Sequence, residues 1–172
     1  MTFFSLAQNR FSCRKFTDKT VEREKIDLIL KSALAAPTAV NKQPQKILVV
    51  TDKNLLEKLK DATKYTFSAP LCFAVCVDKE IAYKRRYDGK SSAEIDGSIV
   101  TTHMMLQAFD IGLGTTWVMA FDPVKVRAAL DIPDNLEILA LLPTGYPADD
   151  VEISPMHSKS VSLGEMAYYN KF

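Results

Sequence analysis

The chain has 172 residues, 47% of them hydrophobic, which is enough apolar surface to fill the core of one domain. Its 22 lysine and arginine residues nearly balance 21 aspartate and glutamate residues, so the net charge is only +1. Such a chain has no overall field that would concentrate nucleic acid or an anionic membrane, and any recognition of an anion must therefore be local.

The cysteines and the N-terminal residues indicate a reducing compartment. Cys13, Cys72 and Cys76 lack the spacing of metal ligands, so we expect free thiols and no bound metal. No basic stretch precedes an apolar run near the N-terminus, and nowhere do about 18 apolar residues follow one another. We therefore expect a cytoplasmic protein without a membrane-spanning segment.

Two helices are predicted before residue 40. Thr2 can cap a short helix that continues to about Asn9. A longer helix is predicted between Thr20 and Pro37, where apolar residues recur at helical spacing. The residues of this stripe are Ile26, Ile29, Leu30, Ala33 and Leu34.

The next part of the chain contains two predicted strands. Residues 47–50 form a short β-branched run typical of a buried strand, and a helix is predicted around 55–59. The run 71–77 is continuously apolar, so we expect a central strand that is covered on both faces. Residues 79–91 are the most polar passage of the chain and are interpreted as a surface excursion.

A long apolar helix is predicted from 92 to 111, with Gly112 in the position that favours a left-handed cap. Its expected apolar stripe consists of Ile95, Ile99, Thr102, Met105, Leu106 and Phe109. A short strand is predicted at 116–120, followed by a helix that begins at Asp122 and Pro123.

The last core strand is predicted at 138–142, running into a turn at 143–147. Ser162 and Glu165 have the spacing of a capping box for a final short helix. Helices thus alternate with about four short strands, which predicts a three-layer α/β arrangement with helices covering a small sheet. The order of the strands cannot be read from the sequence.

Arg10, Ser12 and Arg14 are the strongest indication of a ligand. In an extended segment, alternate side chains project to one face, so these three would cluster. A guanidinium is planar and permanently charged, and a phosphate accepts hydrogen bonds from several donors at once. The stretch predicts an anion site, with a solvated basic turn as the alternative.

Other features suggest ligands less strongly. The glycines of residues 112–117 follow a helix and open a strand, which is the reverse of a dinucleotide-binding fingerprint. The basic residues 84–86 could contact nucleic acid, but one such run in a neutral chain is typical of a solvated surface, and we expect no nucleic-acid partner. Cys13 should point away from its arginine neighbours and act as a structural residue. His103 and His157 are interpreted as a packing and a surface histidine, respectively.

Four motifs in order carry a resemblance to a known family. They are R-F-S-C-R-K-F near the start, A-P-T-A-V-N-K-Q-P one helix later, G-L-G-T-T-W at the end of the long helix, and P-T-G-Y-P before a basic C-terminal stretch. In their order and spacing they resemble the FMN-dependent nitroreductases over essentially the whole chain. The resemblance implies a single domain, residues 1–172, with a small central mixed sheet covered by helices.

The resemblance also implies the flavin contacts. The phosphate would be held by Arg10, Ser12 and Arg14, with Lys159 as the nearest match to a basic pair near the C-terminus. Asn41 would approach the isoalloxazine edge, and the Thr144-Gly145 turn would bring backbone close to the cofactor. The complete implied set is Arg10, Phe11, Ser12, Arg14, Pro37, Thr38, Asn41, Gln43, Lys64, Thr144, Gly145 and Lys159.

The activity implied by the resemblance is transfer of hydride from NADH or NADPH to flavin N5 and then to a nitroaromatic, quinone or similar acceptor in a ping-pong scheme. No protein side chain is expected to be catalytic, because the flavin carries the chemistry. Family members are homodimers with flavin sites at the interface. Alternatives are a related flavoprotein that degrades flavin or removes halogen reductively, and a non-enzymatic FMN-binding protein.

Overall fold

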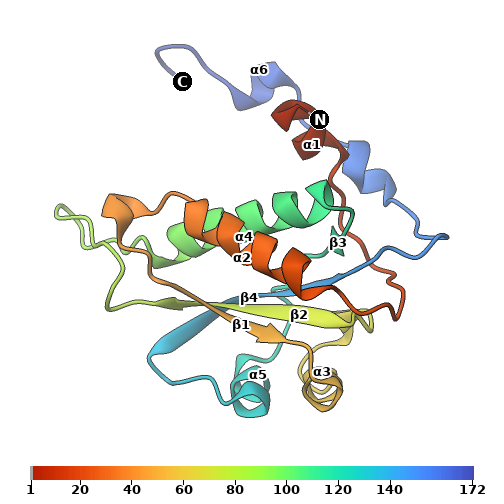
Figure 1. Ribbon diagram of the computed structural model, residues 1–172. Coiled ribbons are helices and arrows are strands. Elements are labelled where there is room, and N and C mark those ends of the chain that lie inside the picture. Colours follow the sequence, from red (N-terminus) through yellow and green to blue (C-terminus); the bar gives the residue numbers. More distant parts are fainter. Residues whose placement is uncertain (1) are drawn as a thin grey trace.

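A four-stranded sheet lies between two layers of helices in the computed structural model, which describes residues 2–172 (Figure 1). The strands are β1 (Gln45–Val50), β2 (Leu71–Asp78), β3 (Gly114–Thr115) and β4 (Leu136–Gly145). They are arranged in the order β1-β2-β4-β3, and each neighbouring pair is antiparallel. Within the described residues, the parallel component expected of a mixed sheet is one isolated bridge, between Ser12 and Thr115.

Two helices cover each face of this sheet (Figure 1). They are α2 (Arg23–Ala35) and α4 (Ala93–Asp110) on one face, and α3 (Lys53–Leu59) and α5 (Pro123–Leu130) on the other. Side chains alternate along a strand, so Phe73 of β2 packs with α2 and α4, whereas Ala74 packs with α3 and α5. The predicted three-layer α/β architecture is thus confirmed.

β2 is the centre of the sheet, as its apolar run predicted. All eight of its residues are buried, and it is hydrogen-bonded to β1 on one side and to β4 on the other. The three cysteines are unpaired and buried. Burial raises the pKa of Cys72 to about 12 and that of Cys76 to about 11, so both remain protonated thiols at neutral pH.

Most helix ends follow the signals in the sequence. The Thr2 hydroxyl accepts from the Ser5 amide at 3.2 Å, and Asp122 accepts from the Val124 amide at 2.9 Å. Gly112 follows α4 with φ +81°, a left-handed conformation that favours glycine. Ser162 and Glu165 form the predicted capping box.

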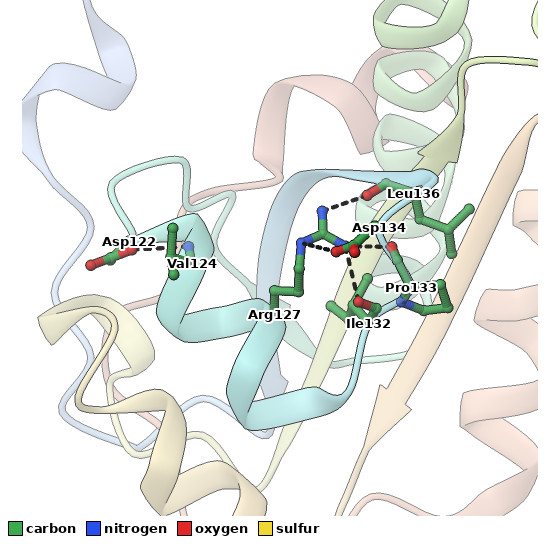
Figure 2. A network of polar contacts seen from close by, with 7 residues as sticks. All are labelled: Asp122, Val124, Arg127, Ile132, Pro133, Asp134 and Leu136. Carbon is green, nitrogen blue, oxygen red and sulfur yellow. Dashed lines mark hydrogen bonds and ion pairs between the residues drawn. The ribbon is translucent and has the colours of Figure 1, made fainter.

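Arg127 closes the connection from α5 to β4 (Figure 2). Its guanidinium donates to the carbonyl oxygens of Ile132 at 2.9 Å, Leu136 at 2.7 Å, and Pro133. Its Nε atom also lies 3.8 Å from Asp134. One side chain thereby binds three carbonyl groups of the segment that leads from α5 into β4.

Two short segments lie away from the sheet. Figure 1 shows α1 (Phe3–Asn9) beside the C-terminal segment that contains η3 (Pro155–Ser158) and α6 (Leu163–Met166). The remaining 3-10 helices are η1 (Ala39–Asn41) and η2 (Lys64–Thr66). None of the residues of α1 or α6 is buried.

Two sequence predictions about strands are wrong. The strand expected at 116–120 is instead the two-residue β3, after which only Val118 forms a bridge, with Leu141. The turn expected at 143–147 is wrong because β4 continues to Gly145, where it pairs with Gly114. Both errors arise from the β3–β4 pairing, a contact between distant residues that local patterns do not encode.

The sequence predicted the buried faces of α2 and α4 only in part. Ile26, Ile29 and Ala33 are buried as predicted, but Leu34 is 69% exposed and Ile95 is 51% exposed. On α4 the buried face centres instead on Val100, Met104 and Ala108 (each 0% exposed). Periodicity alone does not identify the buried face of a helix that is apolar on more than one side.

Among residues 2–172, no helix combines the length and apolarity needed to cross a membrane. The same residues contain no group of three or more histidine, cysteine, aspartate or glutamate side chains placed to hold a metal ion.

Tyr146 connects the end of the sheet to the start of α2, and this contact predicts a pH effect. Its hydroxyl lies 2.5 Å from Glu22 Oε2, and this hydrogen bond, with Lys19 nearby, lowers the pKa of Glu22 from 4.5 to about 2. A lowered pKa in the folded state means that the contribution is present above about pH 4.5 and is lost as the pH falls through about 2. Thermal unfolding at pH 6 and pH 2 should show that Tyr146→Phe is destabilised at pH 6 and much less destabilised at pH 2, where Glu22 is partly protonated. A difference that is the same at both pH values would contradict this assignment.

Candidate functional site

Residues 10–16 form an extended strip along the end of the sheet. Ser12 forms a parallel bridge with Thr115, and the Cys13 amide donates to the Thr115 carbonyl at 2.9 Å. Phe16 forms a second bridge, with Pro147. The sheet therefore fixes the backbone of the segment in which the sequence placed its anion site.

The side chains of this strip alternate as predicted. Cys13 is 0% exposed and packs inward, whereas Arg14 is exposed on the opposite side. Burial raises the pKa of the Cys13 thiol. The Thr116 hydroxyl donates to the Cys13 carbonyl, which adds a further link between the strip and the residues after β3. Cys13 is thus a structural residue, and Ser12 and Arg14 share the outer face.

A cavity of about 290 Å³ opens on that outer face. Its lining residues come from the strip and from the start of the C-terminal segment: Arg10, Phe11, Ser12, Arg14, Ser154, Met156 and His157. The Phe11 ring contacts Phe109 of α4 edge to face, with 6.3 Å between ring centroids. This contact anchors the cavity to the C-terminal end of α4.

The two arginines of the cavity are not paired with acids. Within residues 2–172, neither Arg10 nor Arg14 has a carboxylate oxygen within 4.0 Å, and no acidic side chain lines the cavity. By contrast, Arg23 and Arg85 are paired with aspartates. Two uncompensated guanidiniums and a hydroxyl in one cavity favour a ligand with several anionic oxygens.

The C-terminal segment contributes His157 to this cavity, not Lys159. His157 Nε2 donates to the Gln8 carbonyl at 3.1 Å, which holds η3 against α1. Lys159 follows η3 and is not a lining residue. The family resemblance matched its C-terminal basic pair to His157 and Lys159 together, and Lys159 was preferred because a histidine is usually neutral at pH 7. No pattern in the sequence identified Ser154 or Met156 as residues of the site.

A second cavity, of about 210 Å³, shares Arg14 with the first. It is lined by Arg14, Tyr65, Phe67, Thr116, Trp117, Val118, Met119 and Ala120. Lys64 is not a lining residue, but its Nζ atom lies 5.3 Å from the centroid of the Tyr65 ring. The buried Trp117 Nε1 has no hydrogen-bond partner within the described residues. Arg14 therefore joins a polar cavity to an aromatic one.

Thr144 and Gly145 lie at the end of β4, near these cavities. At both positions, other residues of the chain fill the space around the side-chain position. Thr144 is 0% exposed, and its hydroxyl donates to the Leu142 carbonyl at 2.9 Å. A Cβ atom at Gly145 would lie 2.8 Å from Pro70 and 3.2 Å from Phe16. Packing within the chain is thus sufficient to explain a glycine that the family resemblance attributes to a close approach of the cofactor.

The remaining predicted residues, Pro37, Thr38, Asn41 and Gln43, lie at the other end of the helix layer. Their loop connects the end of α2 to β1, far from α1 in Figure 1. Within it, Val40, Asn41 and Gln43 have φ between +48° and +54°. Such left-handed conformations cost about 1–3 kcal/mol each in non-glycine residues and cluster at functional sites.

The length of α4 gives the distance between the arginine strip, residues 10–16, and the loop that contains Thr38 and Asn41. The Ala39 amide of the loop donates to Asp96 near the start of α4, whereas Phe11 contacts Phe109 near its end. The 13 residues from Asp96 to Phe109 correspond to about 20 Å at about 1.5 Å per residue. One chain therefore does not bring the arginine strip and the loop together.

Another cavity, of about 440 Å³, is a weaker candidate. Arg127 is a lining residue, but its guanidinium is already committed to three carbonyl groups and to Asp134 (Figure 2). Lys79 in the same cavity is paired with Glu137 at 2.8 Å. Its cations are thus compensated, unlike those of the arginine strip.

Comparison with known families matches the Nitroreductase family over residues 7–71 and 64–146, which is more than half of the chain. The chain belongs to the nitroreductase family. A solved nitroreductase family protein of Clostridium difficile 630 is 42% identical, with a TM-score of 0.92 and coverage of 100% of both chains.

Other nitroreductase relatives carry more specific names. An FMN-dependent nitroreductase of Clostridium difficile R20291 is 27% identical, with a TM-score of 0.81, and the match covers 99% of this chain and 100% of that one. A Bacillus subtilis protein named FMN reductase (NAD(P)H) is 25% identical over 185 residues, with coverage of 97% of this chain and 74% of the relative. Membership in the nitroreductase family confirms the fold and the oxidoreductase class that the four motifs indicated.

Proposed function

We propose that the chain is an FMN-dependent oxidoreductase that uses NADH or NADPH and binds the flavin phosphate in the 290 Å³ cavity. The observation that carries this proposal is the pair of uncompensated guanidiniums, Arg10 and Arg14, which share an outer face with the Ser12 hydroxyl. Ser154, from the C-terminal segment, adds a second hydroxyl group to the lining. A phosphate monoester, with about two negative charges and three terminal oxygens, fits this donor set.

When bound, FMN accepts hydride from a reduced nicotinamide and passes it to an electron-poor acceptor such as a nitroaromatic or a quinone. The protein's part is to bind, orient and supply charge. Arg14 borders both cavities, so its guanidinium is placed to act on the ring as well as on the phosphate. Lys64, whose Nζ atom lies 5.3 Å from the centroid of the Tyr65 ring, would supply a second cation beside the aromatic cavity.

A second copy of the chain completes the site. The loop with Thr38 and Asn41 is separated from the arginine strip by most of the length of α4, so in a homodimer the loop of one chain would reach the flavin of the other. Exposed apolar side chains on both terminal segments support such an assembly. They include Phe3 and Phe4 at 74% exposure, Met156 at 66%, Leu163 at 69% and Tyr169 at 87%.

The test begins with the visible spectrum of the purified protein and continues with oxidation of NADH and NADPH in the presence of menadione or nitrofurazone. We expect bound flavin and turnover that alternates between donor and acceptor, as parallel lines in double-reciprocal plots. A protein that refuses added FMN would overturn the proposal. Bound flavin without turnover would favour the non-enzymatic alternative. Light scattering should give a dimer, and a monomer that retains FMN would contradict the shared site.

Replacing Asn41 by leucine should alter the rate of flavin reduction more than flavin retention, because the amide is assigned to the ring and not to the phosphate. Asn41 has φ +54°, so Asn41→Gly provides a variant that loses the amide without backbone strain. Both variants should slow reduction in stopped-flow measurements, and Lys42→Leu in the same loop should not. If all three variants are reduced as fast as the unchanged chain, Asn41 has only a structural role in its loop.

A further inference from the structure

Asp96 is a buried carboxylate that the proposed function does not use. It lies near the start of α4 and is 1% exposed. Its Oδ1 atom accepts from the Ala39 amide at 2.9 Å, and its Oδ2 atom accepts from the Ser92 hydroxyl at 2.7 Å. In the described part of the chain it has no cationic partner within 4.0 Å. Burial removes this carboxyl group from water, and only two hydrogen bonds from neutral donors replace its hydration, which calls for a specific role.

The loop that Asp96 holds, residues 38–43, is otherwise bonded only to itself. The Asn41 and Gln43 amides donate to the Thr38 carbonyl and hydroxyl at 3.0 and 3.1 Å, and the Gln43 side chain donates to Asn41 Oδ1 at 3.1 Å. Across residues 2–172, the Ala39–Asp96 bond is the one hydrogen bond that joins these six residues to another element. Asp96 is thus the single polar tether of the loop.

We infer that Asp96 is a positioning residue, which fixes the Thr38–Gln43 loop so that Asn41 is held in place at the flavin ring of the partner chain. This inference rests on the proposed function. Asp96 touches neither cofactor nor substrate. It acts through the Ala39 backbone, because the loop contains three left-handed residues and, among the described residues, has no other hydrogen bond to α4.

Substitutions of Asp96 and of its neighbours on α4 should differ in whether they break the bond to the Ala39 amide. Asp96→Asn retains a carbonyl oxygen for the Ala39 amide and gains an amide group that can donate to the Ser92 hydroxyl, so the tether persists. Asp96→Ala removes it. Ser92→Ala removes the hydroxyl from Oδ2 but leaves the Ala39 bond. Thr101→Val is the matched control, because it deletes a buried hydrogen bond to Gly97 one turn further along α4 and does not contact the loop.

The first measurement is amide hydrogen exchange of the purified protein without added flavin, followed by mass spectrometry of peptides that cover residues 38–43. We expect faster exchange there in Asp96→Ala, and protection close to that of the unchanged chain in Asp96→Asn, Ser92→Ala and Thr101→Val. Unaltered exchange in Asp96→Ala, or equal loss in Thr101→Val, would overturn the inference. This readout does not depend on flavin, so it decides the role of Asp96 even if the chain binds no FMN and the proposed function fails.

The second measurement is stopped-flow reduction of the flavin-loaded protein by NADH or NADPH. Asp96→Ala should slow reduction by about tenfold to 100-fold, as expected when a group is displaced by about 1 Å. Asp96→Asn and Thr101→Val should remain within about twofold of the unchanged chain. In combination with Asn41→Gly, the Asp96→Ala change should add nothing, because both act through one side chain. Multiplying effects in the double variant would show that Asp96 does not act through Asn41.

Discussion

Arg10→Ala is expected to weaken FMN binding by about tenfold to 100-fold, since losing a hydrogen bond to a charged group costs about 1.5–3 kcal/mol. Arg10 lines the 290 Å³ cavity with no acidic partner in the described residues, so its removal leaves no unpaired charge behind. The fold should be largely unaffected, because Arg10 belongs neither to the sheet nor to the buried core. Titration of the flavin-free protein with FMN, followed by flavin fluorescence, measures the change.

Arg86→Ala is a suitable control for this experiment. Like Arg10, Arg86 has no ion pair among residues 2–172, but it is exposed and lies on the polar excursion outside both cavities. It carries the same charge, so it reports any effect of net charge alone. If the two variants retain FMN equally well, the phosphate does not bind at the arginine strip.

Gly114→Ala should destabilise the protein by about 1–3 kcal/mol, the usual cost of overpacking a filled core. A Cβ atom at Gly114 would lie 2.5 Å from Cys13 Cβ and 2.7 Å from Cys13 Sγ, and Cys13 is fully buried. The strip would have to move away from β3, and its outer face carries Ser12 and Arg14. FMN affinity should therefore fall together with the melting temperature.

The matched control is Gly164→Ala, where an added Cβ would meet no atom within 4 Å. That variant should keep both its melting temperature and its affinity for FMN. Combining Gly114→Ala with Cys13→Gly removes both clashing atoms, so the double variant should lose less stability than the sum of the two single changes. Simple additivity would show that the close approach of Gly114 and Cys13 is not the cause.

Local signals were reliable where one residue decides the local structure. Thr2 and Asp122 cap helices, Gly112 takes the left-handed conformation, and the apolar run of β2 is the buried centre of the sheet. In each case the physical requirement lies within a few residues. β3 was misplaced because a two-residue strand is defined by its partner on β4, and no local pattern specifies that partner.

Of the candidate site, only the arginine strip could be predicted from the sequence. The alternation of side chains along an extended segment is enough to predict that Ser12 and Arg14 point outward and Cys13 inward, as they do. The separation of the loop from the strip could not be foreseen, because it depends on how α4 spans the helix layer. Asp96 was also missed, since an acidic residue near a helix start is common and nothing in the sequence reports its burial.

The position of β2 has a consequence for synthesis on the ribosome. Its partner β4 emerges roughly 60 residues later, a delay of about 3–12 s at about 5–20 residues per second. During that interval one edge of a strand whose first seven residues are apolar has no neighbour, and only the earlier β1 is available to cover the other edge. Nascent chains that stall before residue 136 should therefore recruit chaperones and be prone to aggregate, whereas chains extended beyond residue 145 should not.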